Sequence, residues 1–233
     1  MADTITYRQT IARALSDALE EDPKVIFFGE DVGAAGGAFK TTVGLYDRFG
    51  GERVRDTPIS EQAIVGAALG SAITGLRPVA DLMFADFAGV AFDQIANQVA
   101  KYRYMSNGEL TVPLTILMCN GAGAGFGAQH SQSTENWFLN VPGLKVVVPA
   151  TVEDLYGLVR SAVREDNPVI VLQHKNLFAR KGSVSNDESA IVPIGKPPSC
   201  APGRTSRSWP RSRCGTGPSR RPSSWPTSGS RRR

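Results

Sequence analysis

Glu61 is the first residue whose surroundings suggest chemistry. It ends the stretch 56–61 (Asp-Thr-Pro-Ile-Ser-Glu), in which Pro58 favours extended backbone and Ser60 is a good residue to begin a helix. The segment 62–73 is small and apolar on every face, which predicts a helix in the interior of the protein or its assembly. A carboxylate there needs a strong partner or has a raised pKa, and both outcomes suit a catalyst. It can equally be a charge that complements the helix dipole, and spacing alone leaves both interpretations open.

His130 is the second residue in such a setting. It is one of two histidines, the other being His174, and it follows a glycine-rich loop at the carboxyl end of a predicted strand. Small polar residues surround it in the sequence. A lone histidine is often a structural polar group, but this position suits proton transfer or contact with an anion at neutral pH.

The glycine-rich loop 120–128 resembles a dinucleotide fingerprint only superficially. Read from Gly123, it satisfies the form G-x-G-x-x-A. The true fingerprint also needs a helix that begins in the loop and an acidic residue about twenty positions later. Here the polar run 129–133 follows, and the next predicted strand ends at 149–150 without a carboxylate. We therefore reject an NAD site and interpret the loop as flexible backbone near a ligand.

The pattern of apolar and turn residues predicts alternating helices and strands. Thr6 and Gln9 form a capping-box pattern that opens a helix ended by Pro23. Further helices are expected after Glu61, from about Phe87 to Tyr104, and from 151 through Val163. The expected strands are 25–29, 77–83, 112–119, 144–148 and 168–172. This alternation predicts an α/β fold: a doubly wound, mostly parallel sheet with helices on both faces and ligands bound at the carboxyl ends of the strands.

The composition changes abruptly after Lys196. Residues 197–233 contain nine Arg, nine Ser and seven Pro but no Asp, Glu or Lys, whereas residues 1–196 carry a formal charge of −5. A segment of this kind cannot bury apolar area, so we expect disorder. Arginine-rich tails can bind nucleic acid. We favour another origin, because this composition is typical of a GC-rich gene translated out of frame. The expected organisation is thus a domain at 1–196 and a frameshifted tail at 197–233.

The remaining totals indicate a soluble, cytoplasmic protein. No charged and apolar leader opens the chain, and no run is apolar enough to span a bilayer, so neither membrane insertion nor nucleic-acid binding by the body is expected. Outside the tail there is one cysteine, Cys119, which argues against a disulfide framework or a zinc site.

Six ordered motifs carry a resemblance to a known family. They are 28–32 (Phe-Gly-Glu-Asp-Val), 56–61, 75–78 (Gly-Leu-Arg-Pro), the set Phe84, Phe87 and Asp93-Gln94, 128–133 (Ala-Gln-His-Ser-Gln-Ser) and 142–147 (Pro-Gly-Leu-Lys-Val-Val). Over roughly Thr4 to Gly195 the chain resembles the β subunit of the thiamine-diphosphate-dependent decarboxylating component of 2-oxo acid dehydrogenase complexes, with its transketolase-like pyrimidine-binding domain. Any one motif is weakly specific, but six in this order are highly specific.

The resemblance implies a role for three residues. Glu61 corresponds to the glutamate that hydrogen-bonds the aminopyrimidine ring nitrogen of thiamine diphosphate and favours the tautomer that activates the coenzyme. Phe87 matches an aromatic residue packed against the pyrimidine, although a core aromatic residue would look the same. His130 matches a histidine implicated in substrate handling and in acyl transfer to a lipoyl group. The coenzyme would carry out the carbanion chemistry, and the protein would supply position and electrostatics.

The resemblance also implies a structural potassium ion. Some relatives bind it with main-chain carbonyls at a helix end, which suit a hard cation. The corresponding positions here are Leu114, Ala162, Val163, Glu165 and Asn167. Glu165 replaces an aspartate that is common in relatives, and ordinary helix capping would explain the same residues.

A partner is implied as well. In the family, the diphosphate and magnesium are held by an α subunit through a Gly-Asp-Gly segment, which does not occur in this sequence. The expected state is therefore two α and two β subunits that serve a lipoyl-bearing acyltransferase. Relatives continue beyond Gly195 into a second α/β domain, in place of which this chain has the basic tail. We expect a foldable domain whose assembly and activity are impaired.

Three functions remain open from the sequence. The first is oxidative decarboxylation of a small 2-oxo acid, with pyruvate as the leading substrate, followed by acyl transfer to lipoyl groups. The second is the β subunit of acetoin dehydrogenase, which has nearly the same pattern. The third is a truncated subunit that binds its partner without supporting turnover.

Overall fold

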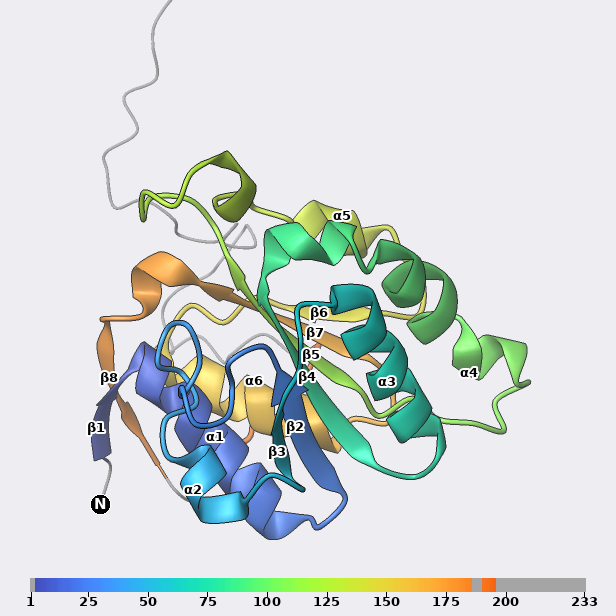
Figure 1. The fold of residues 1–233 in the computed structure, drawn as a ribbon, viewed down its shortest axis with the longest axis horizontal. Coiled ribbons are helices and arrows are strands. Elements are labelled where there is room, and N and C mark those ends of the chain that lie inside the picture. Colours follow the sequence, from blue (N-terminus) through green and yellow to red (C-terminus); the bar gives the residue numbers. More distant parts are fainter. Residues whose placement is uncertain (1–2, 186–189, 196–233) are drawn as a thin grey trace, which may run out of the picture. The chain divides into compact units, whose positions relative to one another are not determined.

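The computed structural model describes residues 3–185 and 190–195 and shows an α/β fold built on a parallel sheet (Figure 1). The strands of this six-stranded sheet, in the order in which they lie side by side, are β3 (Val54–Asp56), β2 (Val25–Gly29), β4 (Arg77–Phe84), β5 (Thr115–Asn120), β7 (Val169–His174) and β6 (Lys145–Val147). A separate antiparallel pair joins β1 (Asp3–Thr6) to β8 (Lys181–Val184). The predicted fold class is thus confirmed. The tail 197–233, which the sequence predicts to be disordered, lies outside the described residues.

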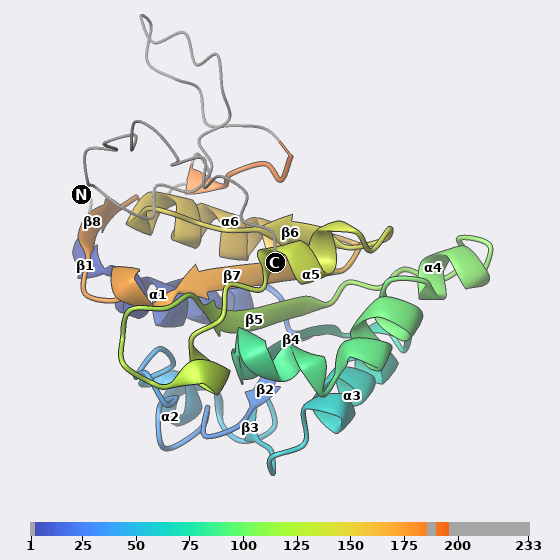
Figure 2. The same cartoon turned by 90° about the horizontal axis from the view of Figure 1, so that it is seen from above.

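Helices cover both faces of the large sheet (Figure 2). On one face lie α1 (Tyr7–Glu21) and α6 (Val152–Arg164), which contact each other. On the other face α3 (Glu61–Ile73) packs on β4 and contacts the π-helical turn η2 (Gln94–Val99). The shorter elements are α2 (Leu45–Phe49), η1 (Ala85–Gly89), α4 (Tyr102–Met105), η3 (Ala128–His130), α5 (Glu135–Leu139) and η4 (Lys175–Leu177). Within the described residues, no helix combines the length and apolarity needed to cross a membrane.

Two helix starts confirm the local sequence signals. The Thr6 hydroxyl accepts from the Gln9 backbone N–H at 3.4 Å, and the Gln9 side chain accepts from the Thr6 N–H at 3.0 Å, which completes the capping box. At α6, the Thr151 hydroxyl accepts from the Asp154 N–H at 3.0 Å. Both caps satisfy backbone donors that would otherwise be unpaired.

The prediction of a long helix from Phe87 to Tyr104 is wrong. The chain instead forms the 3₁₀ turn η1, then the π-helical turn η2, and then the single α-helical turn α4. Apolar spacing in this segment is compatible with all three kinds of turn, so the pattern could not reveal the change. A 3₁₀ turn ends at Gly89, a residue with low helix propensity.

Ser60 occupies the N-cap of α3 but does not cap it with its side chain. Its hydroxyl donates to the Pro58 carbonyl at 3.0 Å. The helix itself is buried on one side within the described chain, through residues such as Ile64 and Ala68, while Ala63 and Ala67 are exposed. The expected interior position is therefore realised on one face of the helix only.

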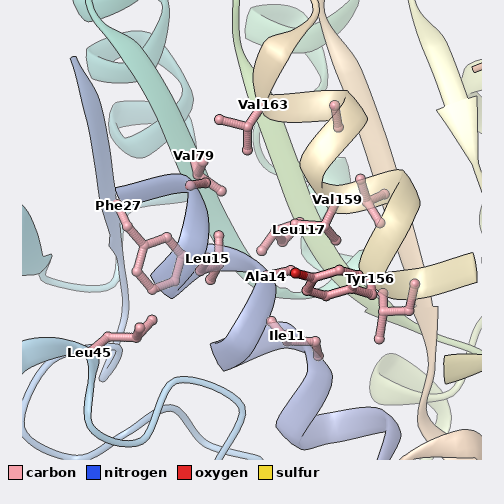
Figure 3. Close-up of a cluster of buried hydrophobic side chains, with 14 of the residues drawn as sticks. Ile11, Ala14, Leu15, Phe27, Leu45, Val79, Leu117, Tyr156, Val159 and Val163 are labelled. Atoms are coloured by element: carbon pink, nitrogen blue, oxygen red, sulfur yellow. The ribbon is translucent and has the colours of Figure 1, made fainter. Parts of the chain in front are cut away.

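The core lies on both sides of the sheet. Figure 3 shows the cluster between α1 and α6, where Ile11 and Leu15 of α1 meet Tyr156 and Val159 of α6 above Leu117 of β5. All five are essentially inaccessible to solvent. A second cluster, centred on α3, fills the opposite face. Burying β4, β5 and β7 on both faces holds the carboxyl edge of the sheet in place.

Gly143 offers a test of this packing. Its φ is +105°, and a Cβ atom there would overlap the Ala100 carbonyl oxygen. Gly108 has a similarly positive φ of +81° but open space around it. Gly143→Ala should therefore lower the free energy of unfolding by about 1–3 kcal/mol more than Gly108→Ala, because only the first variant adds a clash to the backbone strain. Urea denaturation of both variants measures the difference, and equal losses would contradict the packing.

Candidate active site at the carboxyl edge of the sheet

Glu61 begins α3, just beyond the carboxyl end of β3. Its residue is only 7 % exposed. No side chain or backbone group of residues 3–185 and 190–195 donates a hydrogen bond to its carboxylate. A carboxylate so withdrawn from water strongly favours a hydrogen-bond donor. It is thus available to a donor supplied by a bound molecule.

Glu30 stands near Glu61 and was not selected as a site residue from the sequence. It follows β2 directly, and burial raises the pKa of its carboxyl group. The charges of Glu61 and Asp31 raise that pKa further, whereas the Ser60 backbone N–H lowers it. The signal available in the sequence was its place in the motif 28–32, but only the sheet shows that the motif lies beside Glu61.

His130 lies against two phenylalanine rings. The centroid of its ring is 4.5 Å from that of Phe84 and 5.1 Å from that of Phe87, and both pairs are nearly perpendicular. Phe84 and Phe87 also pack edge to face at 5.9 Å. The structure therefore brings together two predicted site residues, Phe87 and His130, from segments that follow β4 and β5. It also adds Phe84 as the ring that contacts both.

An irregularity in β4 directs Phe84 into this cluster. The pairing of β4 with β5 shifts register between Asp81 and Phe84, and Met83 between them has a φ of +57°. The Asp81 carboxylate accepts from the Met83 backbone N–H at 2.7 Å. A register shift re-aims the side chains beyond it, so Asp81 helps to direct the residues after the bulge.

Lys175 and Asp86 were missed by the sequence analysis, although both are buried charged residues beside His130. The Lys175 ammonium group donates to the His130 carbonyl oxygen at 2.7 Å and lies 5.2 Å from the centre of the Phe84 ring. Asp86 accepts from the Gln132 backbone N–H at 3.1 Å. Burial lowers the pKa of Lys175, and the Asp86 carboxylate partly offsets this effect. No motif in the sequence pairs these two positions.

The glycine loop acquires a structural explanation. Gly121, Gly123, Gly125 and Gly127 all have positive φ, which favours glycine. A Cβ atom at Gly121 would overlap the His174 ring, and the Asn176 amide donates to the Ala122 carbonyl at 2.9 Å. The glycines thus allow this loop to pack closely on the segment after β7. His174 belongs to that packing, and its burial lowers its pKa.

The residues expected to bind potassium lie at the opposite edge of the sheet. Leu114 precedes β5, and its carbonyl accepts from the Val169 N–H at 2.9 Å. The others belong to the C-terminal end of α6 and the turn that follows it: Ala162, Val163, Glu165 and Asn167. The Arg77 guanidinium group donates to the carbonyls of Val163 and Glu165 at 3.1 and 3.3 Å.

The Arg77 guanidinium group thus already supplies a cation to the carbonyls at the C-terminal end of α6. Lys145 pairs with the Glu165 carboxylate at 2.7 Å and lowers its pKa. The potassium site stays a prediction. Among the described side chains, no group of three or more His, Cys, Asp and Glu could hold a metal ion.

Comparison with known proteins identifies the family. Residues 3–181 match the family described as transketolase, pyrimidine binding domain, and the chain belongs to this family. A solved structure described as a split-gene transketolase, an inactive β4 tetramer, shares the fold with a TM-score of 0.59 at 24 % identity, over 73 % of this chain and 51 % of that one.

Curated relatives are more similar in sequence. The chain is 44 % identical to the 2-oxoisovalerate dehydrogenase subunit beta of Bacillus subtilis, over 82 % of this chain and 59 % of the relative. It is 44 % identical to a mitochondrial pyruvate dehydrogenase E1 component subunit beta-2 of rice (Oryza sativa subsp. japonica), over 84 % and 53 %. It is 46 % identical to the acetoin:2,6-dichlorophenolindophenol oxidoreductase subunit beta of Cupriavidus necator, over 84 % and 60 %. The chain thus spans somewhat more than half the length of these relatives.

The residues present fit the pyrimidine part of thiamine diphosphate, the coenzyme that the family implies. A polar heterocycle needs an acceptor for its ring nitrogen and an apolar surface for its face. Glu61 offers the first as a buried carboxylate without an internal donor among the described residues, and Phe87 offers the second at the same edge of the sheet.

Asp81 gives this edge a measurable pH dependence. Burial raises the pKa of its carboxyl group from 3.8 to about 6, so the folded state binds the proton more tightly than the unfolded state. The resulting stabilisation is complete below about pH 4 and is lost as the pH rises through about 6. Between about pH 5 and pH 7.5 the protein should lose stability from this group, on the order of 1 kcal/mol.

Asp81→Asn removes this titration but keeps an oxygen acceptor for the Met83 N–H. The free energy of unfolding of the variant, relative to the unaltered chain, should rise by that amount over the same interval in urea titrations. Asp47→Asn changes an exposed carboxylate in α2 and serves as the control. A constant difference for Asp81→Asn across the pH range would contradict the raised pKa.

Proposed function

We propose that this chain is the β subunit of a thiamine-diphosphate-dependent 2-oxo acid dehydrogenase. The observation that carries the proposal is the buried Glu61 carboxylate, which has no donor within the described chain and lies at the same sheet edge as the Phe87–His130 contact. The curated relatives named above, with three different substrates in their names, support the class of reaction.

Glu61 has the central role in the proposed mechanism. Thiamine diphosphate, when bound, supplies the carbanion chemistry that cleaves the bond next to a carbonyl group. Glu61 holds a proton at its carboxylate in a hydrogen bond with the ring nitrogen of the aminopyrimidine. Because the Glu61 carboxylate is buried and accepts no hydrogen bond from the described residues, a donor on the bound coenzyme would stabilise it.

Phe87 and His130 complete the part of the site that this chain supplies. Phe87 offers an apolar face to the pyrimidine and excludes water from it. His130 lies next to that ring. It is proposed to handle the substrate and the acyl group that passes to a lipoyl arm. An α subunit is proposed to hold the diphosphate and magnesium in a complex of two α and two β subunits. The lipoyl-bearing acyltransferase and the structural potassium ion belong to the same proposal.

Glu61→Gln tests the role of the carboxylate. In a complex reconstituted with a matching α subunit, the variant should lose 2-oxo acid turnover by about 10²-fold or more, because the amide is a weaker acceptor and takes no proton. Steady-state kinetics with an artificial electron acceptor measures the loss. Glu52→Gln, an exposed glutamate outside the site, should retain full turnover. Equal turnover in both variants would remove Glu61 from the mechanism.

Acetoin cleavage is a second candidate function, favoured by the 46 % identity to the Cupriavidus necator subunit. Pyruvate, 2-oxoisovalerate and acetoin should be compared in the same reconstituted complex, by kcat/KM. We expect pyruvate to give the highest value. A preference for acetoin would assign the chain to the second function, and a stable complex that turns over none of the three would identify a non-catalytic subunit.

A further inference from the structure

Two buried charged side chains hydrogen-bond the backbone at His130 and two residues after it. Lys175, at the start of η4, donates to the His130 carbonyl oxygen at 2.7 Å. Asp86, in η1, accepts from the Gln132 backbone N–H at 3.1 Å. Lys175 is 6 % exposed and Asp86 8 % exposed, so water competes weakly for either bond.

Burying these charges is costly, and ordinary packing would not require them. The second oxygen of Asp86 is buried without a hydrogen-bond partner among the described residues. The Lys175 ammonium group is further stabilised by the Phe84 ring, whose centre lies 5.2 Å away. Phe84 in turn is the ring closest to the imidazole, at 4.5 Å. One cation therefore contacts both the main chain of His130 and the ring that its imidazole packs on.

We propose that Lys175 and Asp86 are positioning residues that hold the His130 imidazole against Phe84 and Phe87. The segment between Gly121 and Gly127 has four glycines at positive φ and is exposed over most of its length, although its Phe126 ring packs on Phe84 at 6.0 Å, so its backbone constrains the histidine weakly. The two charge-assisted hydrogen bonds supply the missing constraint, because such bonds are stronger than neutral ones. The inference deepens the proposed function, since it rests on His130 acting in that site.

A test on the isolated chain needs no coenzyme. The sequence has only two histidines, so the imidazole signals of His130 and His174 can be assigned in proton–carbon NMR spectra with a His130→Asn variant. Ring currents of Phe84 and Phe87 should displace the His130 signals in the unaltered chain. Lys175→Met should return them toward the position of a free histidine, whereas Lys175→Arg, which keeps a charged donor, should retain the displacement.

A second pair of variants tests the hydrogen bond between Asp86 and the Gln132 backbone. Asp86→Ala removes the acceptor of the Gln132 N–H and should release the His130 signals. Asp86→Asn keeps an oxygen acceptor but loses the charge, so it should release the signals less than Asp86→Ala does. This pair decides the matter even if Lys175→Met fails to fold. Lys181→Met, an exposed lysine in β8, is the control and should leave the spectrum unchanged. Undisplaced signals in the unaltered chain, or unchanged signals in both Lys175→Met and Asp86→Ala, would overturn the inference.

Kinetics of the reconstituted complex gives the functional consequence. Displacing a reacting group by about an ångström costs on the order of 10²-fold in rate, so Lys175→Met should lower kcat by about that factor. In a His130→Ala background, Lys175→Met should lower kcat little further, because both substitutions remove the same function. Additive losses would indicate a merely structural lysine. Complexes without any 2-oxo acid turnover would refute the proposed function but leave the NMR result standing.

Discussion

The parallel pairing of β2, β4, β5 and β7 places the carboxyl ends of four strands along one edge, and the candidate site depends on this alignment. A residue of the candidate site follows each of these strands: Glu30 after β2, Phe87 after β4, His130 after β5 and Lys175 after β7. These residues are distant in the chain. They lie along the same edge because apolar strands buried on both faces cannot shift their register without exposing the core.

Charge is tolerated at this edge only with compensation. The Lys175 ammonium group donates to the His130 carbonyl oxygen and lies over the Phe84 ring. The carboxylates of Asp81 and Asp86 each accept from a backbone N–H group. Glu61 has no such partner within the described chain, which distinguishes it from the other buried charges. Since buried carboxylates without donors are unfavourable, the exception marks the place where an external donor would be most strongly bound.

The two ends of the sheet differ in how their polar groups are satisfied. At the opposite edge, Arg77 supplies donors to the carbonyls after α6, and its guanidinium group also pairs with Asp166 at 2.7 Å. That end has cations that meet its orphan carbonyls, as expected at a helix C-terminus. The contrast between a satisfied end and an unsatisfied end agrees with ligand binding at the carboxyl edge of parallel strands.

The sequence by itself determined the fold class, the strands at 25–29 and near 115–120, the capped helices α1 and α6, and Glu61, Phe87 and His130 as candidates. These features are local: a period, a cap or a motif is read over a few residues. Only the tertiary structure decided that the segment after Phe87 is broken into three kinds of turn, that Phe84 contacts His130, and that Lys175 and Asp86 hold its backbone. Those contacts join positions about 45 residues apart in the chain, and no local pattern encodes them because the sheet register brings them together.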